Sequence, residues 1–164
     1  MMTRRVLTSK ILVAAGLMAA LFSSARASDL AKPEFIIVTQ AGIGNAFNTG
    51  VVRAAVATAH SAVSQHGSGN RADIVQSGKS HSMTVQQDGS LNTVAATQTG
   101  FSNSLDLTQQ GNNNHAVFNQ TGGTRASLSQ IGDLHRAEIN QSFTSPDIVI
   151  HQSGVATVVR TTQY

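Results

Sequence analysis

Apolar and polar residues alternate along short segments that recur about every eleven residues from Ser61 to the end of the chain. Each segment ends in a glutamine. The positions four and two before that glutamine are apolar in eighteen of twenty cases, with Ser61 and Thr161 as the exceptions. Alternation with a period of two is typical of a β-strand that buries one face. The pattern therefore predicts a strand before each glutamine, and the apolar inner face includes Ile74, Val85, Val94, Leu105, Leu107, Phe118, Leu128, Ile139, Ile148 and Ile150.

The glutamines keep one phase over the same stretch. They stand eleven residues apart, except for one interval of ten between Gln120 and Gln130. A strand of about five residues with a single apolar face is not stable alone, so we predict that two successive segments form one rung of about 22 residues. In an all-β solenoid, a cross-β stack of such rungs about 4.8 Å apart, buried amides pair along the stack. The predicted amide ladder comprises Gln65, Gln76, Gln87, Gln98, Gln109, Gln120, Gln130, Gln141, Gln152 and Gln163.

A turn is predicted after each strand. Glycine stands two residues after the glutamine, except at Phe143, and asparagine stands five residues after it in four repeats. In the other repeats the fifth position holds His81, Arg125, His135, Pro146 or Thr157. Glycine adopts positive φ without strain, and asparagine tolerates positive φ while bonding the local backbone. The asparagine side chains are expected to bond one another along the stack, as the glutamines do. The predicted turn residues are Gly67, Gly78, Gly89, Gly100, Gly111, Gly122, Gly132, Gly154, Asn70, Asn92, Asn103 and Asn114.

The beginning of the chain has the layout of a secretory signal peptide. Arg4 and Arg5 precede a 12-residue apolar run at 11–22, and Ala25 and Ala27 stand at the −3 and −1 positions of a cleavage site. A membrane-spanning helix needs roughly 20 apolar residues, so this run is too short for an anchor. We therefore expect cleavage after Ala27 and export of the remaining chain.

The sequence divides into four segments. Residues 1–27 are the expected signal peptide, 28–34 a mobile N-terminal segment, 35–64 an irregular first repeat and 65–164 the regular array. Within the irregular repeat, the Ala- and Val-rich stretch from Val51 to Val63 is interpreted as part of a rung, with a short helix as the alternative.

Charge and composition argue against nucleic acid as a partner and against disulfides as a source of stability. The formal net charge of +3 minus the four basic residues of the signal segment leaves −1 for the mature chain, so we expect no binding to nucleic acid. A near-neutral surface also does little to keep copies of the protein apart. The chain has no cysteine, so disulfides do not stabilise it.

Catalytic chemistry is not expected. The chain carries no phosphate loop, nucleophile elbow or dinucleotide fingerprint. The six histidines share no single repeat phase, although His81 and His135 both replace the turn asparagine, and we interpret all six as surface residues in turns. We therefore predict no enzyme activity, no metal, no cofactor and no small-molecule substrate. A monomeric solenoid that binds polysaccharide or ice is the alternative from another class, but it calls for a regular outward row that the sequence lacks.

The repeat resembles the curlin repeat, whose pattern is Gln-x-Gly-x-x-Asn-x-Ala-x-x-x-Gln. The segments from Gln65 to Gln76 and from Gln109 to Gln120 match it, and the segment from Gln130 to Gln141 departs only at His135. The resemblance extends from about Gln40 to the end of the chain and is specific because the motif is long and iterated.

The resemblance implies a secreted subunit of curli, the functional amyloid fibres of bacterial surfaces and biofilm matrix. It implies partnership with other copies, with other curlin subunits and with an outer-membrane secretion machinery, and location outside the cell. The last repeats lose their turn residues at Phe143, Pro146 and Thr157, which favours a minor, nucleating subunit over a major one. The major fibre subunit remains the alternative. Assembly is expected at the open ends, where unpaired strands accept further strands.

Overall fold

The protein is described by a computed structural model that covers residues 34–42, 49–56, 59–143 and 147–164. Within these residues every regular element is a strand, and strands β1 and β2 are described by their backbone. The strands are β1 (Glu34–Gly42), β2 (Thr49–Val56), β3 (Ala59–Ser68), β4 (Arg71–Lys79), β5 (His81–Ser90), β6 (Thr93–Phe101), β7 (Ser104–Asn112), β8 (His115–Thr121), β9 (Arg125–Asp133), β10 (Arg136–Ser142), β11 (Ile148–Val155) and β12 (Val158–Gln163).

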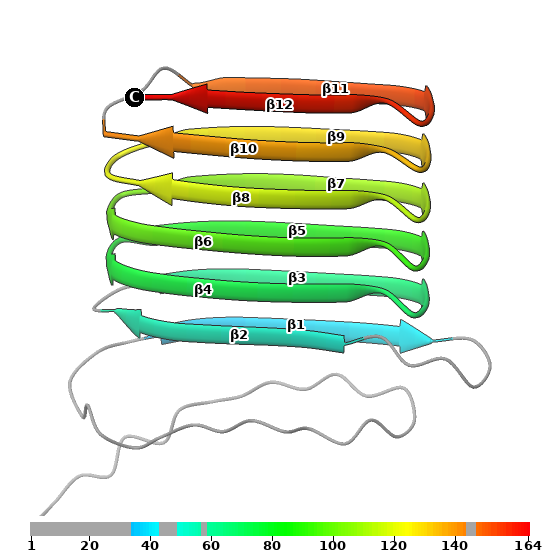
Figure 1. Ribbon diagram of the computed structural model, residues 1–164. Coiled ribbons are helices and arrows are strands. Elements are labelled where there is room, and N and C mark those ends of the chain that lie inside the picture. Colours follow the sequence, from blue (N-terminus) through cyan, green and yellow to red (C-terminus); the bar gives the residue numbers. More distant parts are fainter. Residues whose placement is uncertain (1–33, 43–48, 57–58, 144–146) are drawn as a thin grey trace, which may run out of the picture.

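The strands form two parallel six-stranded sheets that face each other (Figure 1). One sheet has the order β1-β3-β5-β7-β9-β11, and the other has the order β12-β10-β8-β6-β4-β2. Consecutive strands along the chain therefore lie in opposite sheets, and each strand pairs with the strand two places further on. Gln65 pairs with Gln87, which is 22 residues away, so the predicted β-solenoid with rungs of about 22 residues is confirmed.

The core is a thin layer of side chains between the two sheets. From β3 to β10 alternate residues along each strand are buried, as in β5, where His81, Met83, Val85 and Gln87 point inward. The buried apolar cluster is Val63, Ala72, Ile74, Met83, Val85, Val94, Ala96, Leu105, Leu107, Ala116, Phe118, Ala126, Leu128, Ala137, Ile139 and Ile148, with Ile150 half-buried beside it. Because no strand can change register by one residue without turning this face outward, the alternation fixes the pairing.

Positive φ angles are needed at two positions of the turns. Gly89 has φ +115°, and a Cβ there would lie 2.0 Å from the carbonyl oxygen of Gly111 in the next rung, so no side chain fits. The second position is the residue before the turn asparagine, as at Leu91 (φ 59°) and Asn113 (φ 55°). The prediction that the asparagine itself uses its tolerance of positive φ was therefore wrong at Asn92 and Asn114. The preceding residue takes this conformation, which leaves the asparagine side chain free to point into the core.

The shortened repeat between Gln120 and Gln130 loses its residue from the turn. Arg125 pairs with Ser104 in the strand, and Thr124 occupies the buried turn position, where its backbone N–H bonds Asn103 Oδ1 at 3.2 Å. The alignment of Arg125 with the turn asparagines was therefore wrong. A sequence count from the glutamine assumes a turn of constant length, whereas the structure keeps the strand register and shortens the turn.

The irregular repeat before residue 65 also forms strands. β1 pairs with β3, so that Gln40 aligns with Gln65, and β2 pairs with β4, so that Ala54 aligns with Gln76. The described residues of the stretch from Val51 to Val63 are extended, and none of them is helical.

The expected signal peptide at 1–27 and the segment 28–33 lie outside the described residues. Within the described part of the chain, no helix is long and apolar enough to cross a membrane.

Candidate functional site: the amide ladders and the end rungs

A continuous ladder of glutamine amides runs through the sheet that contains β3. Gln65 Nε2 donates to Gln87 Oε1 at 2.7 Å, and Gln87 Nε2 donates to Gln109 Oε1 at 2.8 Å. The ladder continues through Gln130 to Gln152, with distances of 2.8 and 2.7 Å. Every one of these side chains is buried. Each Nε2 points toward the C-terminal end of the stack, so the ladder has a direction.

A second ladder runs through the opposite sheet. Gln76 Nε2 donates to Gln98 Oε1, and Gln98 Nε2 donates to Gln120 Oε1, both at 2.8 Å. Gln120 Nε2 donates to Gln141 Oε1 at 3.1 Å. Gln163 follows in register, and its Oε1 is buried without a hydrogen-bond partner in the described part of the chain.

From Gln87 onward the second N–H of the amides is also used. Gln87 Nε2 reaches Arg71 O at 3.1 Å, and Gln98 Nε2 reaches Ser82 O at 3.3 Å, so these amides also bond the backbone at the start of the preceding strand. A buried amide with both donors and its acceptor paired adds little desolvation penalty and still specifies one register. The ladders therefore hold the rungs in register as well as together.

Asparagines form a different kind of column at the turns. Asn92 N donates to Asn70 Oδ1 at 3.0 Å, while Asn92 Nδ2 donates to Gly111 O at 2.8 Å and to Asp88 O at 3.3 Å. The expectation of side-chain amides bonding one another was therefore wrong for these asparagines. Asparagine is one methylene shorter than glutamine, and its amide meets the backbone of the neighbouring turns.

Two histidines take the place of asparagine in these columns. His81 and His135 are each 1% exposed, so the interpretation of all histidines as surface residues was wrong for these two. His135 Nε2 lies 3.1 Å from Ile131 O, and its Nδ1 accepts the Thr157 N–H at 3.3 Å. The imidazole thus supplies one donor and one acceptor, as the asparagine amide does. The signal in the sequence for this burial is that both histidines share the phase of the turn asparagines.

The His81 ring is only partly satisfied. Its Nε2 lies 3.0 Å from Ser77 O, in the position that corresponds to the bond from His135 to Ile131. Its Nδ1 is buried and has no hydrogen-bond partner among the described residues.

His115 lies on β8, half-buried and directly opposite Arg136 of β10. Burial lowers the pKa of His115 below its ordinary value of 6.5, and the Arg136 guanidinium lowers it further. Both effects disfavour the charged imidazolium.

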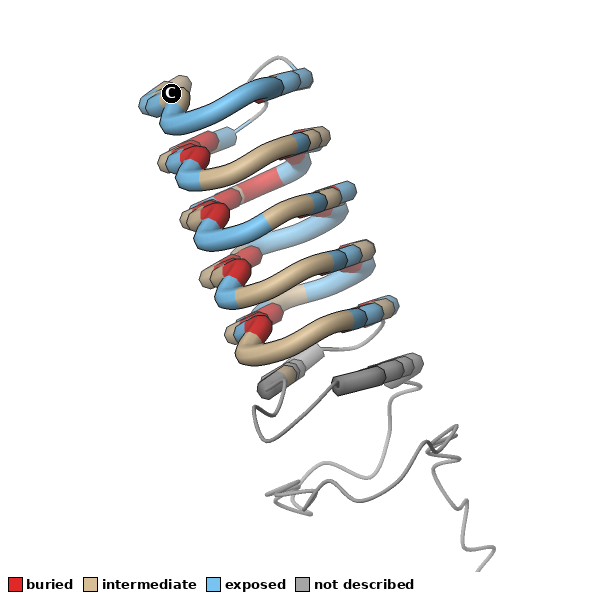
Figure 2. The backbone as a smooth tube through the Cα atoms, turned by 90° about the vertical axis from the view of Figure 1, so that its right-hand side faces the viewer, coloured by how far each residue is buried: buried red, intermediate tan, exposed pale blue. Residues whose placement is uncertain are grey.

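The last rung is the most exposed part of the array. β11 and β12 each pair on one side only, with β9 and β10 respectively, and Figure 2 shows this rung largely pale blue. Val149, Val155 and Val158 are 80%, 66% and 64% exposed. Gly154 continues the glycine column, yet a Cβ there would meet nothing within 4 Å because no rung follows. Backbone donors and acceptors, apolar surface and both glutamine columns are thus presented together at this end.

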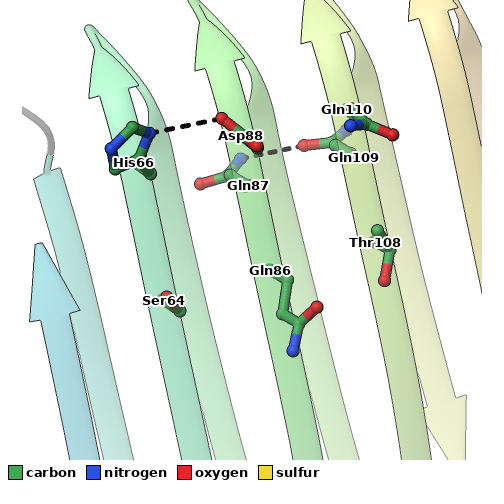
Figure 3. A pocket seen from close by; sticks show the side chains of 8 residues that line it. All are labelled: Ser64, His66, Gln86, Gln87, Asp88, Thr108, Gln109 and Gln110. Carbon is green, nitrogen blue, oxygen red and sulfur yellow. Dashed lines mark hydrogen bonds and ion pairs between the residues drawn. The ribbon is translucent and has the colours of Figure 1, made fainter. Parts of the chain in front are cut away.

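A shallow hollow on the outer face of β3, β5 and β7 is a further candidate site among the described residues (Figure 3). Its lining is polar and exposed apart from the ladder amides, and His66 Nδ1 lies 3.3 Å from Asp88 Oδ1 with both side chains 64% exposed. Ser64 and Thr108 lie on the strands to either side. The described residues hold no cluster of three or more metal-ligating side chains, so this hollow has neither a metal site nor a buried acid–base pair.

The comparison with protein families identifies the repeat. The sequence model of the Curlin associated repeat matches residues 62–89 and 82–111. These are curlin repeats. The matched residues run from β3 to β7, and beyond them the first ladder continues to β11 and the second to β10. The match supports a place in the curlin family, and both the curlin repeat and the β-solenoid are structural in character rather than enzymatic.

No curated protein and no solved structure matches this chain. The relation to curlin proteins therefore rests on the matched repeats and on the geometry of the stack.

Proposed function

We propose that this protein is a secreted structural subunit that assembles end to end into curli-like amyloid fibres for adhesion and biofilm matrix. The observation that carries the proposal is the last rung, where two unpaired strand edges and both glutamine columns face outward together. A second chain that adds its strands to β11 and β12 extends the hydrogen bonding of both sheets.

The repeat itself supplies the geometry of this addition. Each rung already pairs with another of nearly the same sequence, in parallel and in register, as between β5 and β7. A chain docked on the last rung can continue this parallel backbone pairing across the junction. The mature chain's net charge of about −1 gives weak repulsion between copies.

The N-terminal segment and the family support a location outside the cell. A signal peptide at 1–27 directs export, and an outer-membrane secretion machinery then releases the chain at the surface. Within a fibre we assign it the minor, nucleating role, because the last repeats depart from the turn pattern at Phe143, Pro146 and Thr157. Its partners are then other curlin subunits as well as copies of itself.

A substitution at Gly154 tests directly whether chains add to the last rung. In the interior rungs, a Cβ on the corresponding glycines would lie 1.8–2.1 Å from the next carbonyl oxygen, so a docked rung would meet the methyl group of Gly154→Ala. We expect this variant of residues 28–164 to elongate fibres at least about tenfold more slowly, the effect of about 1.4 kcal/mol at the junction. Amyloid-dye fluorescence in seeded growth measures the rate.

The matched control is Gly123→Ala, because a Cβ at Gly123 has its nearest neighbour at 3.6 Å. Urea unfolding of each monomer separates an effect on folding from one on stacking. Equal growth by wild type and Gly154→Ala would argue against addition at this end. A mature chain that stays monomeric for days, with or without curlin seeds, would refute the proposed function.

A further inference from the structure

The two glutamine ladders begin differently at the N-terminal end of the stack. In the first sheet Gln40 of β1 aligns with Gln65, so an amide stands in the first rung. In the second sheet Ala54 of β2 aligns with Gln76, and alanine has no amide to donate. The second ladder therefore starts one rung later than the first.

Ser61 closes this shorter ladder. Its hydroxyl donates to Gln76 Oε1 at 2.6 Å, and both side chains are buried. At Gln98 and Gln120 the corresponding oxygen accepts from the glutamine of the preceding rung. Ser61 is also a polar exception on the inner face, since the aligned residues are Met83, Leu105, Ala126 and Ile148. Its departure from the apolar pattern thus has a specific reason, which is to replace the donor that Ala54 does not supply.

The C-terminal end is different. Gln152 of β11 and Gln163 of β12 place an amide in both columns of the last rung. Gln152 Nε2 is bonded to Arg136 O at 3.2 Å and to Thr157 O at 3.0 Å, and Gln163 follows Gln141 in register. A docked rung therefore continues both columns only if it carries an amide at each of these two positions. The first rung of a second copy offers Gln40 in one column and Ala54 in the other.

We propose that Ala54 and Ser61 make the two ends of the stack unequal, so that the C-terminal rung selects a partner solenoid whose first rung carries an amide in both columns over a second copy of this chain. This inference rests on the proposed end-on assembly and names the residues that decide its partner. Stacking two copies aligns Gln163 with Ala54, a residue type without an amide, whereas a two-amide partner continues both columns. A buried donor without an acceptor opposes docking.

A first experiment supplies the missing amide. Wild-type seeds of the mature chain are extended with Ala54→Gln monomer, with Ala55→Gln monomer, or with wild-type monomer. Ala55 aligns with Ser77, which is exposed, so its variant adds the same amide on the outer face. We expect Ala54→Gln to extend the seeds at least about threefold faster than the other two, as one net hydrogen bond gives.

A second experiment needs no assembly. Ser61→Ala removes the donor to Gln76 Oε1 and should lower the urea midpoint of the monomer. In the Ala54→Gln background the new amide can donate to Gln76 instead, so the same Ser61→Ala change should have a much smaller effect. The Ala55→Gln background serves as the control and should keep the full loss.

The outcomes separate this inference from the proposed function. Fibres that grow equally fast from Ala54→Gln and Ala55→Gln monomer overturn the partner selection and leave end-on assembly standing. If folded monomers of all three chains never extend a seed, the proposed function falls and the partner selection falls with it. An equal loss from Ser61→Ala in every background overturns the closing role of Ser61. Faster growth together with rescue supports the whole inference.

Discussion

The buried polar residues of this protein connect neighbouring rungs through hydrogen bonds of their side chains. In most of the described strands the inner face carries two apolar side chains and one glutamine, and the core between the sheets is a thin layer. The buried amides take over part of this task, because each one pairs with the rung above and the rung below. A change at one ladder residue therefore affects three rungs.

Gln109→Ala should be strongly destabilising. The change leaves Gln87 Nε2 without its acceptor and Gln130 Oε1 without its donor, and both are buried. We expect a loss of about 2 kcal/mol or more in the free energy of unfolding. Urea denaturation followed by circular dichroism measures it. Gln110→Ala is the matched control, since Gln110 is the exposed neighbour, and equal losses would contradict the ladder's contribution.

His81→Asn should stabilise the fold. The change removes the buried Nδ1 that lacks a partner, and an asparagine Oδ1 there can accept a backbone N–H of the next turn, as Asn103 accepts that of Thr124. The expected gain is about 1 kcal/mol. His135→Asn is the comparison, because His135 Nδ1 already accepts the Thr157 N–H, and its stability should change less. Similar shifts in the two variants would refute the explanation.

His115 should make stability depend on pH. Because burial and Arg136 lower its pKa in the folded state, the unfolded chain binds a proton more readily. The stability that the neutral form provides is complete above about pH 6.5 and is lost as the pH falls toward the lowered pKa of the folded state. The difference in urea midpoint between wild type and His115→Gln should therefore change over this range. The same difference for His151→Gln, an exposed histidine, serves as the control, and identical profiles would exclude His115 as the cause.

The phase of the glutamines and the inner apolar face could be predicted from the sequence, because a period of eleven residues repeats the same faces without any knowledge of the structure. The structural roles of Ser61 and Thr124 could not be predicted in this way. The position of Ala54 in the glutamine phase follows from counting back 22 residues from Gln76, but the bond from the Ser61 hydroxyl to Gln76 Oε1 is a contact between opposite sheets that the period does not reveal. Thr124 enters the buried column because the strands keep register while the turn is one residue shorter.

At the scale of the elements, strands and turns differ in how well they tolerate substitutions. The strands accept many side chains on their outer face, whereas the glycine after each ladder glutamine lies against the backbone of the next rung. The backbone oxygens of Gly89 and Gly111 illustrate this, since each lies about where a Cβ of the preceding glycine would be. Turn glycines are therefore contacts between rungs as well as sites of positive φ.

Gly89→Ala should be more damaging than an ordinary turn substitution. The added Cβ would stand 2.0 Å from Gly111 O, and the φ of +115° is unfavourable for alanine. A loss of more than about 2 kcal/mol is expected, because backbone rather than a flexible side chain must move. Urea unfolding of Gly123→Ala provides the control, with a change within about 1 kcal/mol. Comparable losses would show that the close approach does not limit this turn.

At the scale of the whole molecule, the repeating architecture could be predicted from the sequence, whereas the structure of its end rungs could not. Every interior rung has the same neighbours, so one repeat predicts the next. Among the described residues the first and last rungs each have a neighbour on one side only, and their properties depend on residues such as Ala54 and Gln163. For the same reason, substitutions in the interior rungs should mainly affect the stability of the monomer. Substitutions in the end rungs should mainly affect which chains can dock there.

The spacing of paired residues also bears on how such a chain can change in length. Each residue bonds a residue about 22 positions away, and no strand depends on a distant part of the chain. A duplication or deletion of 22 codons that starts and ends within equivalent turns would join matching strands and leave both ladders unbroken. A deletion of eleven codons would instead move every later strand to the opposite sheet. Recombination between its own repeats thus offers this gene a route to taller or shorter stacks without redesigning any interface.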